Sequence, residues 1–188
     1  EGDKGPNTGG IGSYSCADHC LPFLSPQTVR EAQSVNELVF HSLMEALGEP
    51  YRGILYGNFM STGNGLKVIE YNARFGDPEV MNILPLLRCD FIDVCEAMLN
   101  GGLRDVLIEF KSKHTVCKWV VPNGYPTDAV IDGEVDITSI PQSSDRLRVY
   151  FGAINEECGR YKLAGSRAIA FLGIGDSLAE AEQIAERA

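Results

Sequence analysis

The spacing of apolar positions predicts the longest helix of the chain between Ser25 and Gly48. Ser25 followed by Pro26 is a typical helix start, because a serine side chain can cap the first N–H groups and proline fits the first turn. Apolar residues then recur every three or four positions, and Gly48 with Pro50 ends the pattern. The stretch 1–26 is rich in glycine and proline, so we expect turns there rather than a regular element.

A strand pair should follow this helix. The runs Gly53–Met60 and Leu66–Asn72 flank Thr62–Gly65, whose sequence is typical of a hairpin turn. Strict alternation along the second run would place its even-numbered residues, including Glu70 and Asn72, on one face and its odd-numbered residues on the other.

The rest of the chain alternates short helical and extended patterns. Helical patterns cover 79–87, 90–100 and 177–188, and extended patterns cover 116–121, 146–151 and 167–174. We therefore expect an α+β fold. The composition changes near residue 111, which predicts two domains, residues 1–111 and residues 112–188.

Composition and charge limit the classes of function. With 44% hydrophobic residues, the 188-residue chain can bury a core. A formal net charge of −10 repels phosphate backbones and anionic lipids, so neither a nucleic acid nor a membrane is expected as a partner. A local basic pocket could still bind a small phosphorylated substrate. No apolar run approaches the ~18–20 residues of a membrane span, and no secretory signal is recognisable.

The six cysteines form neither a disulfide pattern nor a complete metal pattern. Their spacings are scattered, and a chain of this size does not need disulfides to fold. Cys16, His19 and Cys20 place three soft donors within five residues, whereas a structural zinc site takes four ligands. Free thiols in a reducing cytoplasm are the simpler interpretation, and a metal at this cluster is the alternative.

The glycine-rich stretch from Gly2 to Gly12 is the first candidate for chemistry. Consecutive glycines let backbone N–H groups converge on an anion, and a lysine adds a positive charge. The candidate ligands are Lys4, Gly5, Asn7, Thr8, Gly9 and Gly10. A flexible glycine loop with a solvated lysine is the competing interpretation, and the pattern alone does not decide between them.

The second candidate is the end of the second predicted strand. Glu70 and Asn72 are two residues apart, so their oxygens should leave the same face about 7 Å apart at the backbone. Such a pair could hold Mg²⁺, which binds one or two protein oxygens and fills its other positions with water and phosphate. Arg74 on the same face would suit the charge of a transferring phosphoryl group. The competing interpretation is a sheet-edge Glu–Arg pair of little energetic value.

Together these two motifs resemble the phosphoribosylamine–glycine ligases (glycinamide ribonucleotide synthetases), a family of the ATP-grasp superfamily in purine biosynthesis. The resemblance rests on the runs 2–14 and 68–79 and on Val116-Cys117 followed by Gly124-Tyr125-Pro126, and it extends over essentially the whole chain. It implies the C-terminal half of an ATP-grasp module, an antiparallel sheet with helices, followed by a small β-rich C-terminal domain.

The resemblance also implies an activity. Members of the family use ATP to join glycine to 5-phosphoribosylamine through a glycyl phosphate, giving glycinamide ribonucleotide, ADP and phosphate. Glu70 and Asn72 match the Mg²⁺ or Mn²⁺ ligands of the family, and Arg74 matches a residue expected to stabilise the transferring phosphoryl group. The glycine-rich loop would hold the phosphoribosylamine or the glycyl phosphate. Asp77 joins the substrate-binding set because it should order the loop after the metal-binding strand.

Some features depart from the family pattern. Asn58 lies where many ATP-grasp relatives carry a second metal carboxylate, and the segment 16–22 differs from the usual continuation of the glycine-rich loop. The chain begins without methionine, and the resemblance implies that the N-terminal domain and the adenine-binding part of the module lie outside it. We therefore expect a fragment, inactive alone, whose partners are the missing N-terminal domains. Two alternatives stay open: another ATP-grasp carboxylate–amine ligase, and a non-catalytic anion-binding module.

Overall fold

The computed structural model describes residues 4–188, which form two compact units that interleave along the chain. In the described chain, unit 1 comprises residues 4–17, 77–85 and 113–188, and unit 2 comprises residues 18–76 and 86–112. The composition predicts instead two consecutive domains, residues 1–111 and residues 112–188. The domain boundary near residue 111 stays a prediction. Each unit is described by itself.

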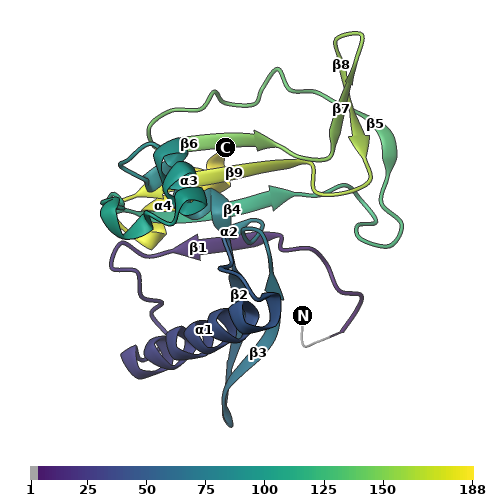
Figure 1. Ribbon diagram of the computed structural model, residues 1–188. Coiled ribbons are helices and arrows are strands. Elements are labelled where there is room, and N and C mark those ends of the chain that lie inside the picture. The colour runs from purple at the N-terminus through teal and green to yellow at the C-terminus, as the bar shows by residue number, and fades with distance from the viewer. Residues whose placement is uncertain (1–3) are drawn as a thin grey trace. The chain divides into compact units, whose positions relative to one another are not determined.

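Unit 1 is built on a four-stranded antiparallel sheet in the order β1-β4-β9-β6, as Figure 1 shows. Its strands are β1 (Gly12–Ser15), β4 (His114–Val120), β9 (Ile169–Gly175) and β6 (Leu147–Phe151). Every residue of β9 is buried, as expected for an apolar strand with a neighbour on each side. The last three extended patterns predicted from the sequence thus correspond to strands of one sheet.

β1 is a correction to the sequence analysis, which expected only turns before residue 26. Gly12–Ser15 pairs antiparallel with Thr115–Lys118 of β4. Four small or polar residues give no apolar alternation, and a partner so far along the chain leaves no local signal. The structure therefore extends regular secondary structure to the end of the glycine-rich loop.

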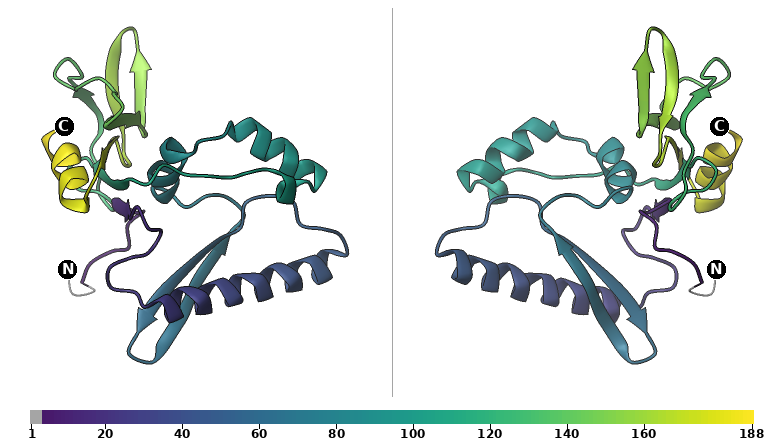
Figure 2. Two further views of the ribbon diagram at one scale, coloured as in Figure 1. Left: turned by 90° about the vertical axis from the view of Figure 1, so that its left-hand side faces the viewer. Right: turned by 90° about the vertical axis from the view of Figure 1, so that its right-hand side faces the viewer.

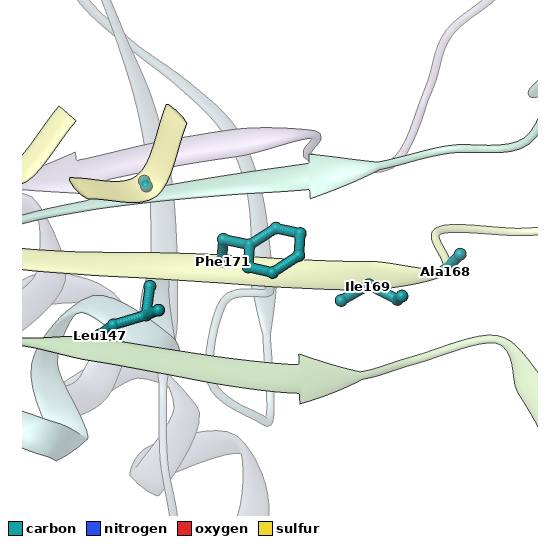
Figure 3. Packing of buried hydrophobic residues seen from close by; sticks show 5 residues of the cluster. Leu147, Ala168, Ile169 and Phe171 are labelled. Carbon is teal, nitrogen blue, oxygen red and sulfur yellow. The ribbon is translucent and has the colours of Figure 1, made fainter. Parts of the chain in front are cut away.

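Helix α4 (Leu178–Arg187) covers one face of this sheet and confirms the helical pattern predicted after Ser177. Ser177 caps the helix, since its Oγ accepts a hydrogen bond from the Glu180 N–H at 3.2 Å. The helix lies so close to β9 that a Cβ on Gly173 would stand 1.9 Å from the Ala181 carbonyl oxygen. Figure 3 shows Phe171 and Ile169 along β9 beside Leu147 of β6, in the cluster that forms the core of unit 1.

A second, three-stranded sheet of unit 1 was not located from the sequence. It contains β5 (Ile131–Val135), β8 (Arg160–Ala164) and β7 (Ile154–Glu157) in the order β5-β8-β7. These strands are short and largely exposed, so charged residues interrupt the apolar alternation that would reveal them.

The helical pattern predicted over 79–87 is shorter in the structure. Helix α2 covers Glu79–Ile83, and a 3₁₀ turn, η1, continues over Leu84–Leu86. Pro85 explains the change, because proline has no N–H to donate and its ring disfavours a continuing α-helix.

Unit 2 contains helix α1 (Pro26–Leu47), the hairpin of β2 (Tyr56–Thr62) and β3 (Gly65–Asn72), helix α3 (Phe91–Asn100) and the 3₁₀ turn η2 (Leu103–Asp105). The predicted ends of α1 are confirmed. Ser25 Oγ accepts from the Thr28 N–H at 3.1 Å, and Gly48 has the left-handed φ of 72° that glycine adopts easily. Figure 2 shows α1 beside the hairpin in both views.

Taken together, the elements make an α+β protein with antiparallel sheets, as predicted from the sequence. Among the described residues, no helix has both the length and the apolar character needed to cross a membrane.

Candidate functional site

The hairpin that carries the candidate metal ligands contains a β-bulge. Asn58 lies opposite Glu70, and the next residue, Phe59, lies opposite Val68, so Ile69 is an extra residue on β3. Residues opposite one another share a face of the sheet, whereas consecutive residues point to opposite faces. Glu70 and Val68 therefore lie on opposite faces, and the prediction that the even-numbered residues of this strand share one face is wrong across the bulge.

One face of the hairpin packs on α1. Tyr71 Oη donates a hydrogen bond to Asn36 Oδ1 at 2.8 Å, and the Tyr71 and Phe59 rings meet edge to face with their centroids 6.1 Å apart. Gly57 lies between them, where a Cβ would stand 2.6 Å from Asn36 Oδ1. Burial on this face raises the pKa of Tyr71. The residues of the other face, Glu70 among them, point away from α1.

Glu70 and Asn72 converge on that other face. Asn72 Nδ2 donates a hydrogen bond to Glu70 Oε1 at 2.9 Å. Half a turn of the Asn72 amide would exchange its nitrogen for its oxygen and direct two oxygens at one point. Asn58, opposite Glu70, adds a third oxygen donor to the same face. One carboxylate and two amide oxygens fit Mg²⁺ or Mn²⁺ as a partial ligand set, which water and phosphate oxygens would complete.

Such a site would depend on a single carboxylate. Within residues 4–188, no three His, Cys, Asp or Glu side chains come together in a group that could hold a metal ion. This finding also covers the cluster Cys16, His19 and Cys20, of which Cys16 is buried and Cys20 is exposed. Weak binding is therefore expected at the hairpin, where phosphate oxygens of a substrate would supply most of the remaining negative charge.

Arg74, the predicted phosphoryl-stabilising residue, lies just beyond β3 and is exposed. Its Nη1 donates a hydrogen bond to the Phe75 carbonyl oxygen at 2.6 Å. The guanidinium is thus held by the neighbouring backbone, and its other donors remain available on an exposed side chain.

The glycine-rich loop precedes β1 in unit 1. Gly2 and Asp3 lie outside the described residues, and residues 4–11 are exposed. The predicted ligands Lys4, Asn7 and Thr8 are thus accessible side chains, and Gly5 adopts a left-handed φ of 107°. These residues present a positive charge and polar groups on an exposed stretch of unit 1.

Gly9 and Gly10 are packed differently from the residues before them. The Gly9 N–H donates a hydrogen bond to Tyr125 Oη at 3.1 Å. A Cβ on Gly10 would stand 2.6 Å from Pro78 Cδ and 3.0 Å from the Asp77 carbonyl oxygen. Both glycines therefore permit close packing within unit 1. The prediction from the sequence was instead that these glycines permit the close approach of an anion.

Asp77 is held by Arg167, a residue that the sequence analysis missed. Arg167 Nη1 lies 3.0 Å from Asp77 Oδ1, and Nη2 lies 2.7 Å from Oδ2, so the two side chains form a two-point salt bridge. Nη1 also donates to the Gly10 carbonyl oxygen at 2.7 Å, and the guanidinium lies 5.2 Å from the ring centroid of Trp119. A single arginine at the start of a strand pattern gives no sequence signal for such a contact.

The structure thus brings the predicted residues into two groups. Glu70 and Asn72 meet in unit 2, and Gly9, Gly10 and Asp77 meet in unit 1.

Comparison with known proteins shows what this chain is similar to. Residues 1–80 match the family model described as phosphoribosylglycinamide synthetase, ATP-grasp (A) domain. The chain is 49% identical over 186 residues to the phosphoribosylamine–glycine ligase of Methanococcus maripaludis strain S2, covering 99% of the chain and 42% of that relative. It is 47% identical over 188 residues to the ligase of that name from Methanocaldococcus jannaschii, with 100% and 42% covered.

A solved structure agrees with these matches. The crystal structure of phosphoribosylamine–glycine ligase from Thermotoga maritima superimposes with a TM-score of 0.76 at 26% identity, covering 100% of this chain and 44% of that one. By its family model, the chain is similar over residues 1–80 to the ATP-grasp class of ligase domains. Within this class the chain is similar to part of a phosphoribosylamine–glycine ligase, and the resemblance predicted from the sequence is confirmed. The chain spans about two fifths of the length of these relatives.

Proposed function

We propose that the protein to which this chain belongs is an ATP-dependent carbon–nitrogen ligase that joins glycine to 5-phosphoribosylamine. The observation that carries the proposal is the convergence of Glu70 and Asn72 on the open face of the hairpin, in a chain that resembles ligases of this name over its whole length. The products would be glycinamide ribonucleotide, ADP and phosphate.

The reaction would proceed in two steps. In the first, a carboxylate oxygen of glycine attacks the γ-phosphorus of ATP, and the bond to the ADP oxygen breaks to give glycyl phosphate. In the second, the amine of phosphoribosylamine attacks the acyl carbon, the C–N bond forms, phosphate leaves and the amine loses a proton. Such chemistry needs positioning and neutralisation of charge more than a nucleophilic side chain.

The predicted metal-binding, phosphoryl-binding and accessible loop residues each have a role in this scheme. Glu70 and Asn72, with Asn58 beside them, would hold Mg²⁺ or Mn²⁺, which when bound supplies positive charge to the ATP phosphates. Arg74 would donate to the transferring phosphoryl group from its free N–H groups. In unit 1, Lys4, Asn7 and Thr8 would bind the phosphate of phosphoribosylamine or the glycyl phosphate, with Gly5 permitting the turn.

The remainder of the whole protein would act together with this chain. The resemblance implies that adenine contacts and a covering loop lie in the part of the relatives outside the matched 42%. We therefore propose that the 188-residue chain is inactive alone and that the missing domains are its partners. The cytoplasmic location inferred from the free cysteines stays a prediction.

An isotope experiment on the complete protein tests the proposal. With glycine labelled with oxygen-18 in its carboxylate, ATP and phosphoribosylamine, one labelled oxygen should appear in the released phosphate, because the acyl C–O bond breaks in the second step. Formation of product without transfer of label would contradict the glycyl phosphate.

Changes of substrate separate the alternatives. A different ATP-grasp ligase would release phosphate with another carboxylate or amine and not with this pair. A non-catalytic module would release no phosphate with any of them.

A further inference from the structure

We propose that Arg167 is a positioning residue that fixes the Gly9–Gly10 turn and thereby orients the open part of the glycine-rich loop, residues 4–8, toward the phosphorylated amine substrate. The positioning of substrate rests on the proposed function. The fixing of the turn rests on contacts within unit 1 alone.

The Arg167 guanidinium joins several groups of unit 1. Arg167 contacts both carboxylate oxygens of Asp77 and the Gly10 carbonyl oxygen at 2.7–3.0 Å, and Nη1 also lies 3.3 Å from the Asp77 carbonyl oxygen. Asp77, Gly10 and Arg167 come from three distant parts of the chain. One side chain therefore joins the loop, the segment before α2 and the start of β9.

Arg167 is itself held in place. Its guanidinium lies against the Trp119 ring, and its side chain is 18% exposed, whereas Asp77 is 44% exposed. A planar, delocalised cation can stack on an indole ring and donate in its own plane at the same time. Lysine has three donors but neither the plane nor the fork, so it could not lie flat on the indole ring and keep the two-point contact with Asp77 at the same time.

The turn at Gly9 is enclosed by side chains on two sides. Gly9 is held on its other side by Tyr125 Oη, and a Cβ on Gly9 would stand 3.2 Å from this oxygen and 3.3 Å from Arg167 Cζ. A Cβ here would be tight against both side chains, so the phenol or the guanidinium would have to shift by a few tenths of an ångström. Residues 4–8 continue from this anchored point and carry Lys4, Asn7 and Thr8, the accessible polar groups of the loop.

The order of the turn can be measured without any assay of activity. In the complete protein labelled with nitrogen-15 at glycine, the Gly9 and Gly10 amides should have order parameters near the rigid value of about 0.85. Arg167→Met should lower them below about 0.6, and Arg167→Lys should give intermediate values. Arg146→Met is the matched control, because it breaks the exposed Arg146–Glu180 ion pair of the same unit without touching the loop.

The kinetic test compares the same variants. Arg167→Met should raise the KM for phosphoribosylamine at least about tenfold, with the KM for ATP changed less than about threefold, because misplacing a binding group weakens its own substrate. Asp77→Asn should raise the same KM less, since it removes the charge but keeps one acceptor for the guanidinium. Arg146→Met should leave both KM values unchanged.

The outcomes separate this inference from the proposed function. Unchanged order parameters in Arg167→Met overturn the anchoring, and a lower order parameter with unchanged KM for phosphoribosylamine overturns the positioning of substrate. An equal rise in the KM for ATP would show general damage and also overturn the positioning. A wild-type protein without ligase activity refutes the proposed function, while the order parameters still decide whether Arg167 fixes the turn.

Discussion

Asn58 lies directly opposite Glu70 in the β2–β3 ladder, on the face of the hairpin that points away from α1. Opposite residues of an antiparallel pair have their Cβ atoms about 4.5–5.5 Å apart, so both side chains can reach one cation. Asn72 reaches Glu70 along the same strand. The bulge at Ile69 creates this arrangement, because without it Glu70 would lie on the face of Val68.

Glu70→Gln in the complete protein tests whether this face binds the metal ion. The change keeps the size and one carbonyl oxygen of the side chain but removes the only carboxylate of the group. Turnover should fall roughly 10²–10³-fold, equivalent to about 3–4 kcal/mol of lost transition-state stabilisation, and higher Mg²⁺ should restore part of it. Asn72→Ala should give a milder defect. Unchanged turnover of Glu70→Gln at limiting Mg²⁺ would refute the assignment.

Asn58→Asp should have the opposite effect on the metal. A second carboxylate beside Glu70 should tighten binding of Mn²⁺, measured by paramagnetic resonance, by about tenfold, or about 1.4 kcal/mol. Asn64→Asp in the exposed hairpin turn is the matched control, because it adds the same charge to the hairpin away from this face. Equal changes in both variants would indicate a general effect of charge and no site.

Gly10→Ala tests the packing of the glycine-rich loop. The new Cβ would overlap Pro78 Cδ and approach the Asp77 carbonyl oxygen, so the loop or the segment at Asp77 must shift. Overpacking of this kind should lower the free energy of unfolding by about 1–3 kcal/mol, measured with urea. Gly63→Ala, at a position where a Cβ meets nothing within 4 Å, should change it by less than about 0.5 kcal/mol.

The structural features that the sequence predicted correctly are those that a few adjacent residues determine. The caps of α1 at Ser25 and Gly48 and the β2–β3 hairpin turn each depend on a few adjacent residues, and all are present in the structure. The bulge was missed because it changes the register without changing the composition of the strand. Arg167 was missed because its partners, Gly10 and Asp77, are far away along the chain.

Asn82 is a further residue whose role no sequence pattern revealed. It lies in α2, is 1% exposed, and its Nδ2 donates to Thr115 Oγ1 at 3.1 Å and lies 3.3 Å from both the Thr115 and Ser13 carbonyl oxygens. Ser13 Oγ in turn contacts Asn82 Oδ1. One buried amide thus connects α2 to β1 and β4. Of these elements, β1 directly follows the glycine-rich loop in the sequence.

Asn82→Ala should therefore destabilise unit 1. The substitution leaves the buried Thr115 and the half-buried Ser13 without this partner, which should cost roughly 2–4 kcal/mol of unfolding free energy. The measurement is urea unfolding followed by the fluorescence of Trp119, the one tryptophan of the chain, which lies in unit 1. Asn155→Ala, at an exposed position of β7, should change the stability by less than about 0.5 kcal/mol. Equal effects of the two changes would contradict a structural role of the buried amide.

Cys117 predicts how stability depends on pH above neutrality. Burial raises the pKa of its thiol to about 12, the negative charges of Asp77 and Glu79 act in the same direction, and Arg167 opposes them. In the unfolded chain the thiol has a pKa of about 9, so between that pH and about 12 the folded state binds more protons than the unfolded state. This difference should lower the unfolding free energy by up to about 1.4 kcal/mol per pH unit in that window, with no contribution below it.

Cys117→Ala should flatten the slope of unfolding free energy against pH between pH 9 and 11, an interval chosen within that window. Cys158→Ala, which removes an exposed thiol, should leave the slope as in the wild type, and parallel slopes for all three proteins would show that Cys117 ionises as readily in the folded chain as in the unfolded one.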